Sequence, residues 1–325
     1  MRNLNREAAI WHLFTSAEFY ESAARECEDI MRWFGTLAVA RQVANFGRNN
    51  QIFDYFKKRA RDFRRGAELA RLGDYKFIWD FSDCIRGDIR GIMEQPLHSW
   101  MTEAEYQEFS GNRINRLLAY AGTITRALNN AMTAAHSFLK PDPDCPERSD
   151  DDDGFPGDEI IEAYDWYCSD FAGSSFPTIP DPLPEYMIDR SVTCRTGDEV
   201  PWTGVWYPDT GLERHSLAFA IKGLRMQPVF RVVKTEEELE RENEGVMIYS
   251  PETLAVATTW HPVIPTGLQA ETDKELRVKA GDSCPKAGIW QPVDSGAAQQ
   301  RTYQFGETMV NLGSAYGITV WRWME

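Results

Sequence analysis

Carboxylates are the side chains in this sequence whose spacing could support chemistry. Glu159, Glu162, Asp165 and Asp170 lie close together in the chain, and paired carboxylates can act as general acid and base. The sequence contains no P-loop, GxGxxG, HExxH or GxSxG motif that would support a catalytic centre. We therefore expect no enzymatic activity, and an enzyme with an unrecognised carboxylate site in the C-terminal half is the alternative.

A run of aspartates in the middle of the chain could bind calcium. It comprises Asp150, Asp151, Asp152 and Asp153. When Gly154 is placed at the sixth position of an EF-hand loop, the twelfth position falls on Ile160, where a bidentate glutamate is required. The sequence therefore excludes an EF-hand.

No metal or cofactor is expected elsewhere. The six cysteines include no CxxC pair and have no histidine at zinc-ligand spacing. His12, His98 and His136 lack the glutamate three positions earlier that di-iron bundles require. The first residues have no signal-peptide pattern and no apolar run has the length of a membrane span, so we expect a cytoplasmic protein with reduced thiols.

The acidic charge of the chain is concentrated in one segment. The 325 residues carry a net charge of −15, with 50 acidic and 35 basic residues. Residues 141–190 hold 15 of the acidic residues and 2 of the basic ones, among Pro and Gly residues that interrupt packed elements. We interpret this segment as an acidic linker with one short helix, which separates domain 1–140 from domain 191–325.

This acidic segment is either a solvated linker or an anionic surface. An anionic surface would attract a cationic partner and speed their encounter. It would repel free nucleic acid, so no direct nucleic-acid binding is expected. The candidate partner-binding residues are Asp150, Asp151, Asp152, Asp153, Asp158, Glu159, Glu162 and Asp165.

Residues 1–140 are predicted to form an antiparallel helical bundle. Apolar residues recur every three or four positions over residues 10–34, 53–70 and 114–138, which is the spacing of a buried helix face. A fourth helix is expected over residues 75–93. Basic residues between positions 57 and 65 alternate with acidic ones, so we interpret this stretch as solvated helix surface rather than a phosphate-binding site.

Capping and turn residues predict where these helices end. Thr102 and Glu105 fit a capping box before the last long helix. Short turns are expected at Gly35, Gly73 and Pro96, and short turns make consecutive helices antiparallel neighbours.

The C-terminal half contains an internal repeat. Segments 197–208 and 281–292 share the pattern Gly-Asp-x-x-Pro-x-x-Gly-x-Trp-x-Pro. The shared residue types impose backbone turns and supply a large core side chain, so each copy is predicted to be a small β unit. The repeated positions are Gly197, Pro201, Gly204, Trp206, Gly281, Pro285, Gly288 and Trp290.

Strand-like runs follow both copies of the pattern. They predict a β-rich domain whose two units span about residues 193–250 and 277–325. Thr235 and Glu238 predict a capped short helix between the copies. The expected fold class is therefore α+β. The repeat is interpreted as structural, and a ligand site at Trp206 or Trp290 is the alternative.

The second copy and the residues after it resemble a known family. Arg301-Thr-Tyr-Gln-Phe-Gly-Glu-Thr-Met309 and a closing Thr319-Val-Trp321-Arg-Trp323 follow the repeat. This combination is similar to the bacterial polymorphic-toxin immunity proteins of families 71 and 72. Val310 departs from the family pattern, in which proline is expected after the methionine. The resemblance covers roughly residues 190–325.

The resemblance implies a cytoplasmic antidote. Members of these families bind a co-encoded toxin, often one delivered by type VI secretion, and block its active site. The chain is most similar to members that act against nuclease toxins. The implied partner is thus a cognate toxin, and an adaptor protein of a secretion system is a further alternative.

Overall fold

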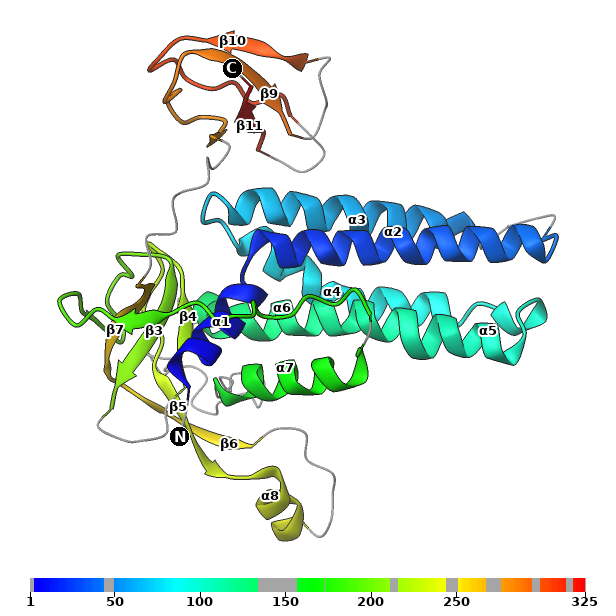
Figure 1. Ribbon diagram of the computed structural model, residues 1–325, viewed down its shortest axis with the longest axis horizontal. Helices are drawn as coiled ribbons and strands as arrows, with labels where there is room; N and C mark the ends of the chain where they lie inside the picture. The colour runs from blue at the N-terminus through cyan, green and yellow to red at the C-terminus, as the bar shows by residue number, and fades with distance from the viewer. Residues whose placement is uncertain are drawn as a thin grey trace, which may run out of the picture.

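The chain folds as an α+β protein, as predicted (Figure 1). The structure is a computed structural model that describes residues 3–43, 50–133, 157–172, 174–210, 216–243, 251–266, 276–293, 299–313 and 318–324. Within these residues, helices occupy the N-terminal half and antiparallel sheets the C-terminal half.

Four long helices form most of the N-terminal half. α2 (Ala17–Ala40) and α3 (Asn50–Ala70) lie side by side, and α4 (Lys76–Met93) packs against α6 (Asn115–Thr133). Their apolar stripes meet in one hydrophobic core. The shorter elements are α1 (Leu4–Phe14), the 3-10 turn η2 (Leu97–Ser99), α5 (Glu103–Gln107) and the π-helical segment η3 (Glu108–Ile114).

Two details of the predicted bundle are wrong. The apolar repeat over residues 10–34 predicted one helix, but the structure has two, because α1 ends at Phe14 and α2 begins at Ala17. The side chain of Ser16 caps the start of α2 by accepting a hydrogen bond from the N–H of Phe19. Gly35, expected in a turn, lies inside α2. A Cβ atom there would lie 3.2 Å from the ring of Phe53 on α3, so this glycine permits close packing of the two helices.

Other predicted helix ends are confirmed. Gly73 has a φ of +78° between α3 and α4, and Pro96 begins the turn after α4. Thr102 and Glu105 form a capping box at the start of α5. Residues 134–138 of the last predicted helix lie outside the described residues.

The basic stretch of α3 is less solvated than expected. The side chains of Arg59 and Asp62 are 11% and 5% exposed and form an ion pair of 3.0 Å. Arg65 is 2% exposed, and its guanidinium donates a hydrogen bond to the carbonyl of Ile318 in the C-terminal half. The prediction of solvated surface is therefore wrong for these three residues, and Arg65 connects α3 to the C-terminal half.

Helix α7 (Asp158–Asp170) lies in the acidic segment and packs on the bundle (Figure 1). Its buried side chains are Ile160, Tyr164 and Tyr167, which occur at the spacing of one helix face. These side chains belong to the same hydrophobic core as the long helices. The acidic segment is thus attached to the body at this helix.

The first antiparallel sheet packs directly on the helices. Its strands lie in the order β1 (Tyr186–Ile188), β7 (Thr259–Pro265), β3 (Gly204–Asp209) and β4 (Ala218–Ala220), and β2 (Cys194–Arg195) also pairs with β7. The ring of Phe219 on β4 lies 5.1 Å from that of Tyr75 beside α4. Val205 and Val263 join the same core, so the helices and this sheet share one hydrophobic interior.

A two-stranded ribbon extends from the first sheet (Figure 1). It consists of β5 (Val229–Lys234) and β6 (Glu252–Val256) with α8 (Glu236–Glu242) at its end. The predicted capped helix is confirmed, because Thr235 and Glu238 form the capping box of α8.

The last sheet has a hydrophobic core of its own. Its strands lie in the order β10 (Arg301–Tyr303), β9 (Gly288–Pro292), β11 (Val320–Trp323) and β8 (Arg277–Lys279). Trp290, Tyr303 and Trp321 form the centre of a separate cluster. Ion pairs join this sheet to α3 and to the turn after it: Arg277 binds Glu68 on α3, and Lys279 binds Asp74 in the turn at 2.9 Å.

The two larger sheets contain corresponding contacts. Strands β4, β3, β7 and β2 pair in the same order as β10, β9, β11 and β8. Gly197 and Gly281 have φ values of +90° and +94°. Their N–H groups donate to the carbonyls of Met226 and Met309, both at 2.8 Å.

Trp206 and Trp290 also occupy corresponding places, and both side chains are fully buried. Each indole N–H donates to a carbonyl four residues earlier, that of Trp202 at 3.3 Å and that of Lys286 at 3.0 Å. Val310, where the family pattern has proline, donates its N–H to the hydroxyl of Tyr303 at 3.2 Å. A proline could not make this hydrogen bond.

Candidate functional site

The predicted partner-binding residues divide into two groups. Asp150, Asp151, Asp152 and Asp153 lie outside the described residues. Asp158, Glu159, Glu162 and Asp165 all lie on α7. The structure therefore brings the second group together on one helix.

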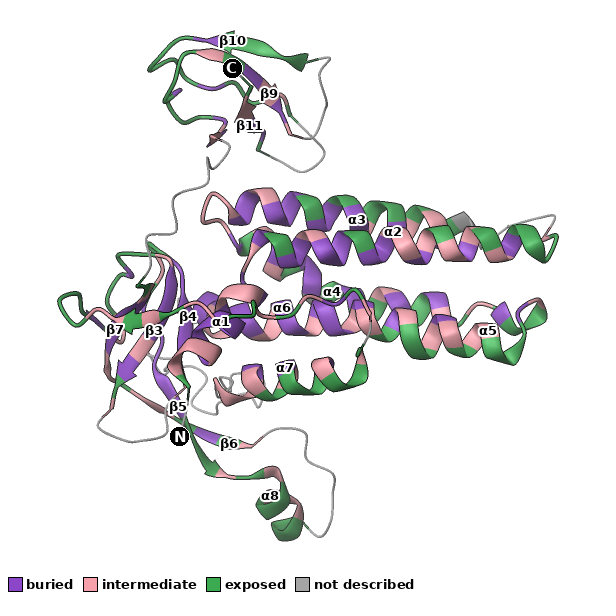
Figure 2. Ribbon diagram, in the orientation of Figure 1, coloured by how far each residue is buried: buried purple, intermediate pink, exposed green. Residues whose placement is uncertain are grey.

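Helix α7 has one buried face and one exposed face, and Figure 2 shows exposed residues along its outward side. The exposed residues recur every three or four positions, which places them on one side of the helix. They are Glu162, Asp165, Trp166, Ser169 and Asp170. We call these five residues the α7 face.

Two of the predicted carboxylates make contacts within the molecule instead. The hydroxyl of Ser216 donates to Asp158. Glu159 forms an ion pair of 3.1 Å with Arg126 on α6. Burial raises the pKa of Glu159, and the charge of Arg126 opposes this increase. Asp158 and Glu159 thus fix the start of α7 to the body.

Asp165 belongs to the α7 face and is also paired. Its carboxylate binds the guanidinium of Arg6 on α1, while its side chain stays 59% exposed. Arg6 in turn lies over the ring of Tyr164, 5.7 Å from the centroid. These contacts hold the middle of α7 in place and leave Asp165 accessible from outside.

Sequence reasoning missed Trp166, which stands in the centre of the α7 face. Its side chain is 52% exposed. Its ring lies 5.0 Å from that of Tyr167 and 5.8 Å from that of Phe171. The available signal was its position four residues after Glu162, on the side of the helix opposite Tyr164. An exposed tryptophan supported by two rings is preorganised for contact.

The contacts of the α7 carboxylates add no support for the alternative of a catalytic carboxylate pair. Glu159 and Asp165 each form an ion pair with an arginine of the same chain, Arg126 and Arg6 respectively. Among the described residues, no group of three or more His, Cys, Asp or Glu side chains could hold a metal ion.

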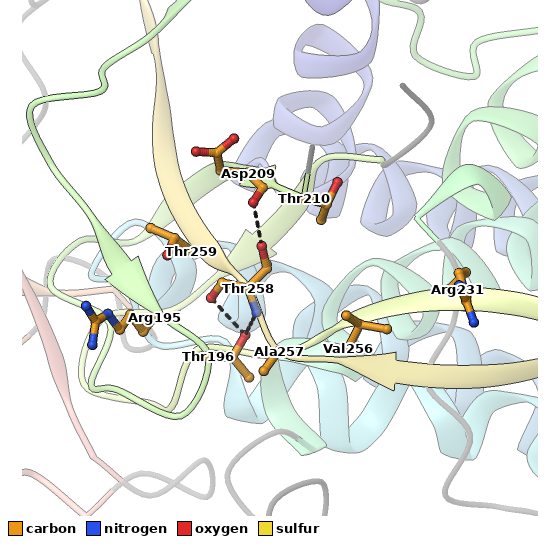
Figure 3. A pocket seen from close by; sticks show the side chains of 9 residues that line it. All are labelled: Arg195, Thr196, Asp209, Thr210, Arg231, Val256, Ala257, Thr258 and Thr259. Carbon is orange, nitrogen blue, oxygen red and sulfur yellow. Dashed lines mark hydrogen bonds between the residues drawn. The ribbon is translucent and has the colours of Figure 1, made fainter. Parts of the chain in front are cut away.

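A cavity of about 520 Å³ lies where β6 bends into β7 (Figure 3). Thr258 donates its hydroxyl to the carbonyl of Asp209 at 3.0 Å and its N–H to the hydroxyl of Thr196 at 3.0 Å. Arg195 and Arg231 lie on opposite sides of the view and do not point toward one another. The hydrogen bonds of Thr258 therefore stabilise the bend between β6 and β7. The two arginines of this cavity do not point toward a common position.

No helix in the described part of the chain is both long enough and apolar enough to cross a membrane. Comparison with known proteins found no matching family model, no matching curated protein and no matching solved structure.

Proposed function

We propose that this protein is a cytoplasmic immunity protein that binds a cognate antibacterial toxin, a nuclease, and covers its active site. One observation carries the proposal. The α7 face presents a half-exposed, ring-supported Trp166 among the acidic side chains of Glu162, Asp165 and Asp170. The resemblance of the C-terminal residues to immunity proteins of families 71 and 72 supports the same function.

The chemistry of the α7 face suits a nuclease. A nuclease binds a polyanion and therefore carries a cationic surface around its active site. Acidic side chains would steer such a surface toward α7, and their effect would weaken as salt increases. Tryptophan is the residue type that most often dominates the free energy of a protein interface. The α7 face therefore combines a steering charge with an anchor.

We also propose that the two larger sheets are copies of one β unit. The shared strand order, the paired positive φ values at Gly197 and Gly281, and the matching indole hydrogen bonds of Trp206 and Trp290 support this. In this interpretation β5, α8 and β6 are an insertion in the first copy. The second copy joins Met309 to Trp321 without such an insertion.

The experiment that tests the toxin-binding function begins with affinity purification of the tagged protein from its native host, followed by mass spectrometry. A nuclease recovered in stoichiometric amount is then assayed for activity with and without the purified protein. We expect inhibition at equimolar ratio. Recovery of a permanent secretion component, or a nuclease that remains fully active in the complex, would contradict the proposal.

Substitution of Trp166 tests whether α7 forms the toxin-binding interface. Trp166→Ala should weaken binding of the recovered toxin roughly 30-fold, since interface anchors contribute about 2 kcal/mol or more. Phe305→Ala is the matched control, because Phe305 is also an exposed aromatic residue, at 78%, but lies in the turn after β10 of the last sheet. Equal effects of the two substitutions would remove α7 from the interface.

A further inference from the structure

The last sheet has an outer face, on the side away from its own hydrophobic core, which a helix meets at one end. On this face Gln291, Arg322 and Arg277 lie side by side on β9, β11 and β8. Arg277 forms the ion pair with Glu68, so α3 meets the face at β8. Ile289 lies two positions before Gln291 on β9 and therefore points to the same face. The face thus extends from its contact with α3 to β9 and β10.

The end of this face at β9 and β10 is open. Ile289 is 42% exposed and Met324 is 39% exposed, and the N–H of Met324 donates to the carbonyl of Ile289 at 2.8 Å. Thr302 of β10 is the direct partner of Ile289 and is exposed as well. Figure 2 shows exposed residues along β10. We call Ile289, Thr302 and Met324 the open face.

The corresponding positions of the first sheet are covered. Counted along the strand pairings from the buried Trp206 and Trp290, they are Val205, Phe219 and Val263. These three side chains are at most 3% exposed and belong to the core that the sheet shares with the helices. Helix α1 contacts β3, and α6 contacts β4. The first sheet therefore uses this face to pack on helices.

The open face has apolar side chains at two of the positions that the first sheet buries. Ile289 and Met324 lie next to each other on neighbouring strands. A sheet face that serves only to meet water alternates polar residues outward, and exposed apolar residues that lie together indicate a contact surface. The open face is thus suited to a helix, like its counterpart in the first sheet.

Charge around the open face indicates which kind of helix fits. Among the described residues between positions 276 and 324, five are basic and two are acidic, in a chain whose net charge is −15. Where α3 and the turn after it meet this sheet, they supply carboxylates, Glu68 to Arg277 and Asp74 to Lys279. Arg301, next to Thr302 on β10, is exposed and forms no ion pair within the described part of the chain.

We propose that the open face binds an amphipathic helix of a partner protein, and that this helix carries carboxylates beside its apolar side chains. The apolar side chains pack on Ile289 and Met324, which continues the contact of this face with α3. The carboxylates meet Arg301, which complementary charge favours. A second copy of the chain and nucleic acid are both opposed by the net charge of −15. The contact is separate from the α7 face and does not depend on toxin binding there.

Photo-crosslinking of the full chain in its native host tests this proposal. Ile289 is replaced by p-benzoylphenylalanine, and the crosslinked peptide is identified by mass spectrometry. We expect a peptide of another protein that forms a helix and contains Asp or Glu. The proposal is overturned by the absence of a crosslinked protein, by a crosslink to this chain or to nucleic acid, and by a peptide that lacks acidic residues.

Val310 is the matched control position. It is 40% exposed and belongs to the same sheet region, but its N–H and its carbonyl bond the side chains of Tyr303 and Trp321, which point to the core side of the sheet. The same crosslinking residue at position 310 should not capture the partner helix. Capture of the same peptide from both positions would overturn the assignment to the open face.

Affinity measurements with the purified partner then assign the contact to these side chains. Ile289→Asp should weaken binding tenfold or more, because it removes an apolar contact and places a carboxylate against an acidic helix. Val310→Asp should leave the affinity unchanged. Arg301→Gln should weaken binding about threefold at low salt and less at high salt. Thermal unfolding verifies that each variant folds, and an unchanged affinity of folded Ile289→Asp would overturn the proposal.

Discussion

Glu68 of α3 binds Arg277 of β8 directly, so one ion pair joins the helical half to the last sheet. The side chains are 13% and 11% exposed, which makes this pair well shielded from water. Lys279 with Asp74 and Arg65 with the carbonyl of Ile318 add to the same junction. The last sheet is therefore attached by charged groups, whereas the first sheet is attached by apolar packing.

Replacement of Glu68 tests the strength of this junction. Glu68→Gln should lower the free energy of unfolding by roughly 1 to 3 kcal/mol, because the largely buried Arg277 loses a charged hydrogen-bond acceptor, whereas Arg71 keeps Glu18 and Glu21. Urea denaturation followed by circular dichroism measures the change. Asp80→Gln is the control, since the Lys76–Asp80 pair is exposed and should contribute little. Similar losses for both variants would contradict the expected role of Glu68.

The separate core of the last sheet predicts local unfolding. Trp290→Ala removes a fully buried side chain and should destabilise this sheet by about 3 to 5 kcal/mol. Hydrogen exchange should then show loss of protection in strands β8, β9, β10 and β11, while amides in α2 and α3 keep theirs. Equal loss of protection in α2 would show that the whole chain unfolds as one unit.

Much of the fold was predictable because it depends on local spacing. The apolar repeats predicted the long helices, and the capping boxes at Thr102 and Thr235 were confirmed. The break at Ser16 was missed, since an apolar repeat can continue in phase across two packed helices. Gly35 was misassigned because close packing and a turn both favour glycine.

Long-range contacts account for the parts of the candidate site that could not be predicted. The ion pair of Asp165 with Arg6 joins residues far apart in the sequence, so no local pattern announces it. Arg65 looked solvated among charged neighbours but is buried against the carbonyl of Ile318. Trp166 was overlooked because its exposure depends on which side of α7 the body covers.

Glu105 predicts a pH-dependent difference in stability. Its carboxylate accepts hydrogen bonds from Arg41 and from the N–H of Thr102, which lowers the pKa of Glu105 from 4.5 to about 2. A lowered folded-state pKa gives stability that is present above the unfolded value of about 4.5 and is lost as pH falls toward 2. Glu105→Gln should therefore be less stable than the native protein at pH 6, and the difference should be much smaller at pH 2.5 and vanish only below pH 2.

Urea midpoints at both pH values measure this difference. Glu94→Gln serves as the control, because the exposed Arg90–Glu94 pair should give a small difference at either pH. A gap between native protein and Glu105→Gln that does not narrow at low pH would refute the assigned cause.

Replacing glycine by alanine tests the turns at Gly197 and Gly281, which precede the buried Trp206 and Trp290. We expect these changes to lower the free energy of unfolding, and a helical control to raise it. Gly281 has a φ of +94°, and an added Cβ atom would meet nothing within 4 Å, so the cost of Gly281→Ala is that of the backbone alone, about 1 to 2 kcal/mol. Gly197→Ala, at φ +90°, should cost a similar amount. Gly91→Ala, in open space on α4, should instead stabilise by about 0.5 to 1 kcal/mol, because alanine favours helix. Chemical denaturation of the three variants measures these signs, and a stabilising Gly281→Ala would show that the turn tolerates an ordinary residue.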